Sequence, residues 1–363
     1  MGRWLTVIPT LCLLGSASAF LPHAPAPLAR TGRAAAPLPN RRNSAMAGPP
    51  LRMSGSPPKP LEAYRREAVG SNVVGRDSGK VAFPLLDPSR FVHPFDRQAT
   101  AALASLPFFE DIVRTGFGGM LEQAIYLDNL SNSIRVGPKQ LPQIYNSLQE
   151  AKMILGLDKV AVDVYVRQNP LPNAFTLAMQ GKKPFIVLHS SLIELLSPEE
   201  VQAVIAHELG HLKCEHGVWI TMANIITNLA SQVPGFGRQV AESLNLGTLR
   251  WLRAAELSCD RAALLVTQNP RVVVSVIMKL SGGAASFGKD LNPDEFLRQA
   301  QDFEQESTNS WMFRRMRDTL TNTLSHPLPV ERVRELDRWS KSDEYRSLLA
   351  GGDPIKAAVS QAP

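Results

Sequence analysis

Two histidines and a glutamate stand close together in residues 207–211, which read HELGH and have the pattern HExxH. Residues four apart on an α-helix lie on one face, so His207 and His211 could direct two imidazole nitrogens at a single metal ion. Imidazole nitrogens are common zinc ligands, and Glu208 beside them could hold and deprotonate a metal-bound water. The pattern predicts metal-assisted hydrolysis, although two histidines on an amphipathic helix could also be ordinary core or surface residues.

The residues around HExxH predict the helix that this arrangement needs. Residues 197–200, Ser-Pro-Glu-Glu, form a capping box with proline at the first helical position, which starts a helix about ten residues before the motif. An apolar stripe typical of a helix with one buried face follows, made of Val201, Val204, Ile205, Leu209 and Leu212. This context favours metal binding over a chance match.

A catalytic zinc ion needs a third protein ligand and an open position for water. Residues 250–263 are rich in alanine and leucine and lack glycine and proline, which predicts a second helix. Glu256 and Asp260 are four apart on it and share a face. We expect Glu256 to bind the metal and Asp260 to accept the free N–H of a liganding histidine. A solvated acidic face is the alternative, and the small apolar residues around both acids argue against it.

Together these segments resemble those of the gluzincin metallopeptidases that include HtpX and the CAAX prenyl endoproteases, from about residue 150 to 345, and the middle of the chain is closest to soluble plastid members. The resemblance implies an α+β, mostly helical, zincin-like fold with a small antiparallel-edged sheet and an HExxH active-site helix. It also implies one zinc ion per chain, bound by His207, His211 and Glu256, with Glu208 as general base. The family usually has ELSAD where this chain has ELSCD, so Cys259 occupies a small-residue position.

Residues 326–332, HPLPVER, resemble the HPxxxxR segment of the same family, whose histidine approaches the active-site cleft. This implies that His326 is either a donor to the developing oxyanion or a removable fourth zinc ligand. A surface histidine in a proline-rich turn is the alternative. Arg332 is expected to pair with an acid of the frame and not to touch substrate.

These residues predict a zinc-dependent metalloendopeptidase that hydrolyses protein or peptide substrates through a zinc-activated water. One alternative is a zinc-bound but inactive scaffold or chaperone-like protein, which the intact Glu208 argues against. Another is a structural zinc site, but such sites usually have four Cys or His ligands. Cys214, three residues after His211, is expected to pack near the site without binding metal.

The first 53 residues have the composition of a targeting sequence. Residues 1–19 hold one arginine, an apolar run from Trp4 to Leu14 and a small-residue end, as in a signal peptide. Residues 20–53 hold five arginines and no acid, as in a transit peptide. With Phe20 at the junction, the order resembles the bipartite signal of algae with secondary, red-lineage plastids. We expect a plastid protein, in the stroma or at a membrane surface; secretion is the alternative.

The net charge of +6 comes from this segment. Without its six arginines the chain has 33 basic and 33 acidic residues, so charge gives no reason to expect nucleic acid as a partner. Residues 218–233 are apolar but include Thr221, Asn224, Thr227, Asn228 and Gln232, and they fall short of the ~20 apolar residues of a membrane span. Burial of residues 218–229 in the core is expected, with peripheral membrane or lipid-body association as the alternative.

Composition and periodicity divide the rest of the chain. Residues 54–95 read as a linker or extended arm, 96–150 as a helical accessory region, 151–349 as the metallopeptidase domain and 350–363 as a flexible tail. A strand is expected at 160–166 and a hairpin at 173–189, whose last strand before the zinc helix would be an edge strand for substrate. Further helices are expected near 97–106, 108–116, 140–155, 271–281, 293–306, 310–322 and 329–349.

Overall fold

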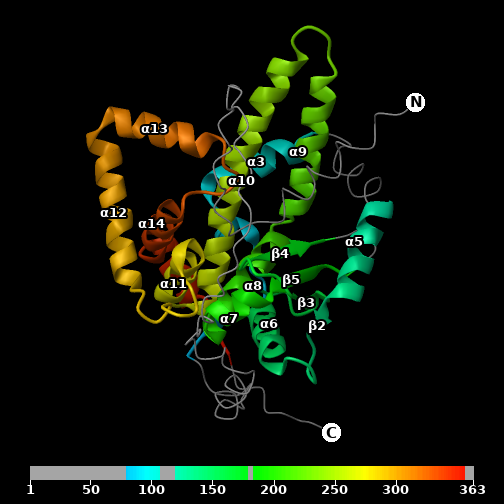
Figure 1. Ribbon diagram of the computed structural model, residues 1–363, viewed down its shortest axis with the longest axis vertical. Coiled ribbons are helices and arrows are strands. Elements are labelled where there is room, and N and C mark those ends of the chain that lie inside the picture. The colour runs from blue at the N-terminus through cyan, green and yellow to red at the C-terminus, as the bar shows by residue number, and fades with distance from the viewer. Residues whose placement is uncertain (1–78, 107–118, 179–182, 356–363) are drawn as a thin grey trace, which may run out of the picture. The chain divides into compact units, whose positions relative to one another are not determined.

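The computed structural model describes residues 79–106, 119–178 and 183–355 of the chain (Figure 1). The signal and transit segments, the helix expected at 108–116 and residues 180–182 of the hairpin turn lie outside these residues. The described part is mostly helical, with a four-stranded sheet and a short two-stranded one. The expected α+β, mostly helical class is confirmed.

The four-stranded sheet has the order β2-β3-β5-β4. Strands β3 (Asp163–Arg167) and β5 (Phe185–His189) are parallel, whereas β2 (Ile134–Arg135) and β4 (Ala174–Leu177) pair antiparallel on the outside. The expected hairpin is present, because β4 pairs with β5 from Ala174 opposite Leu188 to Leu177 opposite Phe185. The expected edge strand was wrong: β5 precedes the zinc helix but is internal and wholly buried, and β4 lies at the edge.

Two helices carry the candidate site. Helix α8 (Pro198–Lys213) begins at the predicted capping box, in which the Ser197 side chain accepts from the Glu200 amide and Glu200 accepts from the Ser197 amide at 2.7 Å. Helix α10 (Gly237–Thr267) is much longer than the segment predicted at 250–263 and packs along α8. On other sides α8 contacts α6 (Pro142–Ile154), α11 (Pro270–Gly282) and β4.

Helix α9 (His216–Ser231) joins α8 to α10 and forms a long hairpin with α10 (Figure 1). Near its start Trp219, Ile220 and Met222 are buried and pack with Trp251 of α10, as expected for residues 218–229. Toward its end Leu229 is exposed, so the core covers only the first half of that segment. Among the described residues, no helix combines the length and the apolar character needed to cross a membrane.

The segment before the main domain is more ordered than its composition suggests. Strand β1 (Val81–Ala82) pairs with β6 (Asp353–Pro354), and a 3-10 helix spans Pro88–Arg90. Phe83, Phe91 and neighbouring apolar residues are buried in the main core, because they have enough apolar area to fold onto it. Residues 81–92 and 353–354 therefore differ from the extended arm and flexible tail that composition predicts.

The remaining helices surround this core. The expected helix at 329–349 is two helices, since Ser342 interrupts it and caps the second by accepting from the Tyr345 amide. The helices are α3 (Pro94–Ala104), α5 (Gly119–Asn132), α7 (Ser190–Leu195), α12 (Pro293–Asn309), α13 (Trp311–Asn322), α14 (Pro329–Ser340) and α15 (Asp343–Ala350).

Candidate metal centre

The two motif histidines of α8 face Glu256 of α10. The Nε2 atoms of His207 and His211 lie 3.4 Å from Oε2 and Oε1 of the Glu256 carboxylate, respectively. Two ligands of a tetrahedral zinc ion lie about 3.3 Å apart when each bond is about 2.0–2.1 Å long. Glu256 is buried, and its Oε2 atom makes no hydrogen bond within the described part of the chain. The donor types, spacing and burial therefore fit a zinc ion.

The charges around these groups also suit a cation. Burial would lower the pKa of His207, but Asp260 and Glu256 outweigh it and raise that pKa to about 9. Burial would raise the pKa of Glu256, yet its three histidine neighbours hold it well below the usual range. An environment that stabilises a protonated imidazole beside a carboxylate stabilises a metal cation for the same electrostatic reason.

Cys259 is a second geometric candidate for the third ligand. Its sulfur and the ring nitrogens of His207 and His211 lie within 4.8 Å of one another. Burial and nearby acids raise the pKa of Cys259 well above the usual range. Glu256 is favoured as the ligand by its geometry, because its two oxygens lie 3.4 Å from the two imidazole nitrogens. Cys214 is the C-cap residue of α8 and packs against the core, as expected of a packing residue.

His207 is oriented by a carboxylate that is itself clamped. Its Nδ1 atom lies 3.1 Å from Oδ1 of Asp260. Arg332 donates from Nε to Oδ2 of Asp260 at 2.8 Å and from Nη2 to Oδ1 at 2.6 Å. All three side chains are buried. The expected pairing of Arg332 with an acid of the frame is confirmed, and Asp260 lies where a positioning carboxylate would act.

His211 has a different support, which was not predicted from the sequence. Its Nδ1 atom lies 3.0 Å from Nδ1 of His216, and Nε2 of His216 lies 3.1 Å from Oδ2 of Asp96 in α3. A third histidine five residues after His211, at the start of a helix, was the available signal for His216. No comparable signal points to Asp96, which joins the site only through packing of α3 on α9 and α10.

Asp96 is a buried carboxylate with four hydrogen-bonding neighbours. Besides His216 it accepts from Ser258 Oγ at 2.6 Å, Trp251 Nε1 at 2.8 Å and Thr100 Oγ1 at 3.2 Å. Burial would raise the pKa of Asp96, but His216 and these donors lower it to about 2. The group is therefore a fixed negative charge at the far end of the His211 contact.

Glu208, the expected general base, is held by one of its two oxygens. Thr176 of edge strand β4 donates to Glu208 Oε2 at 2.7 Å. The other oxygen, Oε1, is buried and makes no hydrogen bond to a described residue. Thr176 was not predicted from the sequence, because the strand before the zinc helix was expected to be the edge strand and β4 has that place. The contact fixes the carboxylate while leaving one oxygen for a ligand.

His326 lies at the site and not in a surface turn. Its Nδ1 atom is 3.4 Å from Oε2 of Glu256, and its side chain is 19% exposed. The loop between α13 and α14 that carries it is tied to α10, because Arg253 donates to the Leu324 carbonyl at 2.6 Å. The surface-histidine alternative was wrong, and both site roles fit this position.

Gly210 brings the two helices close together. A Cβ atom at this position would lie 3.0 Å from the Cβ of Ala262 and 3.2 Å from the Cα of Cys259. Such contacts are tighter than packed side chains tolerate without a shift. A glycine here therefore allows the backbones of α8 and α10 to approach beside the candidate metal-binding side chains.

Comparison with known proteins agrees with this geometry. Residues 138–340 match peptidase family M48. Over 269 residues the chain is 53% identical to the plastoglobule-localized metallopeptidase 48, chloroplastic, of Arabidopsis thaliana. The aligned residues cover 74% of this chain and 77% of that protein. It is 26% identical over 194 residues to a protease HtpX homolog of Moorella thermoacetica, covering 46% of this chain and 62% of that one. A protease HtpX homolog 2 of Methanosarcina mazei is 28% identical over 171 residues, covering 40% and 58%.

Proposed function

Because the chain belongs to peptidase family M48, a family of metallopeptidases, we propose that it is a zinc-dependent endopeptidase whose single zinc ion is held by His207, His211 and Glu256. The observation that carries this assignment is the pair of 3.4 Å separations between imidazole nitrogens and the two oxygens of one buried carboxylate. No hydrogen bond accounts for Glu256 Oε2 within the described residues, although the atom is buried. A bound cation would satisfy it.

Glu208 is the proposed general base. When bound, zinc lowers the pKa of a water ligand toward neutrality and polarises the substrate carbonyl. Glu208 takes the proton of the attacking water on Oε1 and delivers it to the leaving nitrogen, while Thr176 holds Oε2. His326 lies beside Glu256, where it can donate to the developing oxyanion.

The substrate is proposed to bind as an extended chain along β4. This strand pairs with β5 on one side and forms the outer edge of the sheet on the other. Because Thr176 of β4 contacts Glu208, a backbone added to that edge would run past the catalytic carboxylate. Main-chain pairing of this kind tolerates many side chains, which suits protein and peptide substrates.

The proposed location is a plastid, peripherally at a membrane or lipid-body surface or in the stroma. The arginine-bearing, acid-free presequence supports it, as does the name of the Arabidopsis relative. A fluorescent fusion to residues 1–60 tests the address. Arrival in the plastid is expected, and secretion of the fusion would overturn the assignment.

The function is tested on the purified full chain by zinc analysis and casein cleavage, with and without a chelator. One zinc ion per chain and chelator-sensitive cleavage are expected. Glu208→Gln should keep zinc and lose at least ~10²-fold activity, because it removes the base and no ligand. His207→Ala, His211→Ala and Glu256→Ala should each lose the metal. Cleavage that survives in Glu208→Gln would remove this residue from the mechanism.

A further inference from the structure

Helix α13 turns most of its apolar side chains away from the protein. Phe313 and Thr321 face inward, and the Phe313 ring packs on Phe303 of α12 with centroids 5.5 Å apart. On the outward side lie Trp311, Met312, Met316 and Leu320, which are 75%, 58%, 59% and 62% exposed. A surface helix ordinarily buries its apolar stripe, so this helix has an apolar face that the rest of the described chain leaves uncovered.

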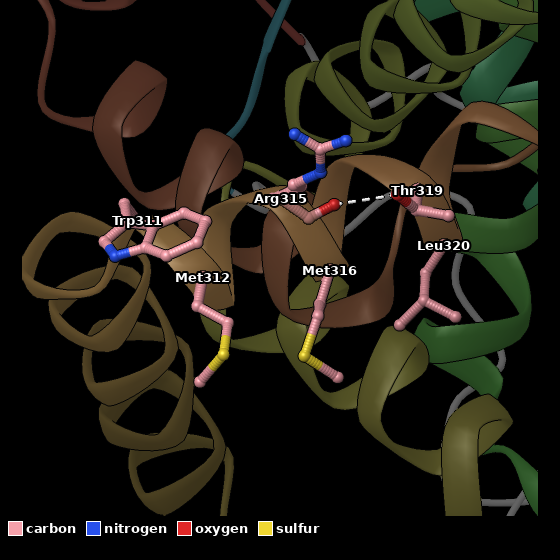
Figure 2. A pocket seen from close by; sticks show the side chains of 6 residues that line it. All are labelled: Trp311, Met312, Arg315, Met316, Thr319 and Leu320. Carbon is pink, nitrogen blue, oxygen red and sulfur yellow. Dashed lines mark hydrogen bonds between the residues drawn. The ribbon is translucent and has the colours of Figure 1, made fainter.

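These side chains line an open groove along the helix (Figure 2). Met312, Met316 and Leu320 point to the same side of α13, while the guanidinium of Arg315 extends away from them (Figure 2). Thr319, the other polar lining residue, donates to the Arg315 carbonyl at 2.9 Å. The groove therefore presents almost no polar group to a ligand.

A lipid surface fits this face better than a peptide does. An extended peptide needs partners for its backbone amides and carbonyls, and a helix flank offers none because its own backbone groups are paired. Acyl chains need no such partners. Arg315 lies beside this face, whereas Arg314 donates to the Ser307 and Thr308 carbonyls and Arg317 pairs with Asp318. Tryptophan, flexible apolar side chains and flanking arginines are typical of helices that lie in the headgroup region of anionic lipid surfaces.

The hairpin of α9 and α10 adds a second exposed apolar set. Helix α13 packs against α10, so both features belong to the same group of helices. The exposed apolar residues of the hairpin are Leu229, Val233, Phe236, Val240, Leu244 and Leu246. Single exposed apolar residues scattered over a surface are ordinary, whereas two groups of them indicate a surface that binds another apolar surface.

We propose that the outward face of α13 binds a lipid surface with anionic headgroups, Met312, Met316 and Leu320 entering the acyl region and Arg315 the headgroups. The proposal rests on the proposed lipid-body location only for the choice of surface. It concerns a face made of residues distinct from the metal centre, so membrane binding and peptide hydrolysis are separable.

Flotation of the full chain with phospholipid vesicles tests this proposal. The Met312→Ser/Met316→Ser/Leu320→Ser variant should lower the vesicle-bound fraction at least about tenfold on phosphatidylcholine containing about one fifth phosphatidylglycerol. The same loss is expected on pure phosphatidylcholine in about 1 M salt, where attraction by the basic presequence is screened. A matched control changes three exposed leucines outside α13, Leu85, Leu127 and Leu171, to serine and should float like the unchanged protein. Arg315→Glu should weaken binding to the anionic vesicles only.

Three results would overturn the proposal. Unchanged flotation of the triple variant in both lipid arms would show that α13 does not hold the surface. A shift of that variant from dimer to monomer, with lipid binding intact, would assign the face to a second copy of the chain. A raised KM for casein without lipid would assign it to peptide. Casein cleavage and zinc content of the triple variant should otherwise stay unchanged. A failed flotation test would therefore leave the peptidase assignment intact, and a Glu208→Gln variant that stays active would leave the lipid-binding proposal intact.

Discussion

The two histidines proposed to bind zinc are supported in unlike ways. His207 contacts a carboxylate directly, and Arg332 clamps that carboxylate from α14. His211 contacts a second histidine, and only beyond it comes the carboxylate of Asp96 in α3. Asp260 and Arg332 lie within residues 138–340 that match the family, whereas Asp96 lies before them. The carboxylate at the end of the His211 support therefore comes from the segment that precedes the peptidase region.

The chain of contacts from His211 through His216 to Asp96 is compatible with one placement of the ring protons when His211 binds metal. To bind metal through Nε2, His211 must carry its proton on Nδ1 and donate it to Nδ1 of His216. His216 must then carry its own proton on Nε2 and donate it to Asp96. Burial lowers the pKa of His216, which favours the neutral ring that this chain of donors requires. One carboxylate can thus select a tautomer through an intervening imidazole.

His326→Ala should have the largest effect on activity of the changes compared below. It also shows whether two histidines bind zinc or three. As an oxyanion donor, His326 should account for a ~10²- to 10³-fold loss of kcat on removal, with zinc retained. The measurement is steady-state casein or peptide cleavage alongside metal analysis. A variant that keeps or gains activity while binding zinc less tightly would make His326 a removable fourth ligand, with a support of its own to identify.

Asp260→Asn tests the direct support. It should weaken zinc binding by ~10- to 100-fold, measured by competition with a chelator. It also puts a neutral amide in place of the carboxylate in the buried Arg332–Asp260 pair, and breaking such a pair costs about 3–5 kcal/mol. Urea unfolding of the metal-free protein should register that loss. Complete release of zinc, as in Glu256→Ala, would instead make Asp260 a ligand.

His216→Gln tests the indirect support and should weaken zinc binding by about tenfold, at the low end of such effects. The visible spectrum of the cobalt-substituted protein should shift, because it reports the geometry of the ligands and not only stability. His189→Gln is the matched control: His189 is also buried, but its ring nitrogen bonds the Leu171 carbonyl at 2.8 Å and not a proposed zinc ligand. If His216→Gln weakened zinc binding as much as Asp260→Asn does, the direct and the indirect support would be equally important.

Cys259→Ala should have the smallest effect. It restores the small residue usual at this position, and zinc stoichiometry and cleavage should stay unchanged. The result matters because the thiol is the geometric competitor of Glu256. If this variant lost zinc while Glu256→Ala kept it, Cys259 and not Glu256 would be the third zinc ligand.

Local patterns in the sequence predicted the parts of the site that depend on helical spacing. The capping box of α8, the i, i+4 pair of histidines and the i, i+4 pair of acids all follow from one helix at a time. His326 and Arg332 came from a resemblance. Asp96 and Thr176 were missed because their contacts depend on how distant elements pack, which no local pattern contains. The same holds for α13, whose helix was predicted but whose uncovered face was not.

The close approach at Gly210 has a consequence for metal uptake. Because Gly210 has no side chain, α8 packs closely on Ala262 and Cys259 of α10, and this packing holds the distance between the histidines and Glu256. The entropy of bringing these ligands together is then lost when the chain folds and not when the metal arrives. Metal-free protein should already have the spacing of the loaded form. Zinc exchange would therefore be limited by access to preformed ligands and not by refolding of the ligands around the ion.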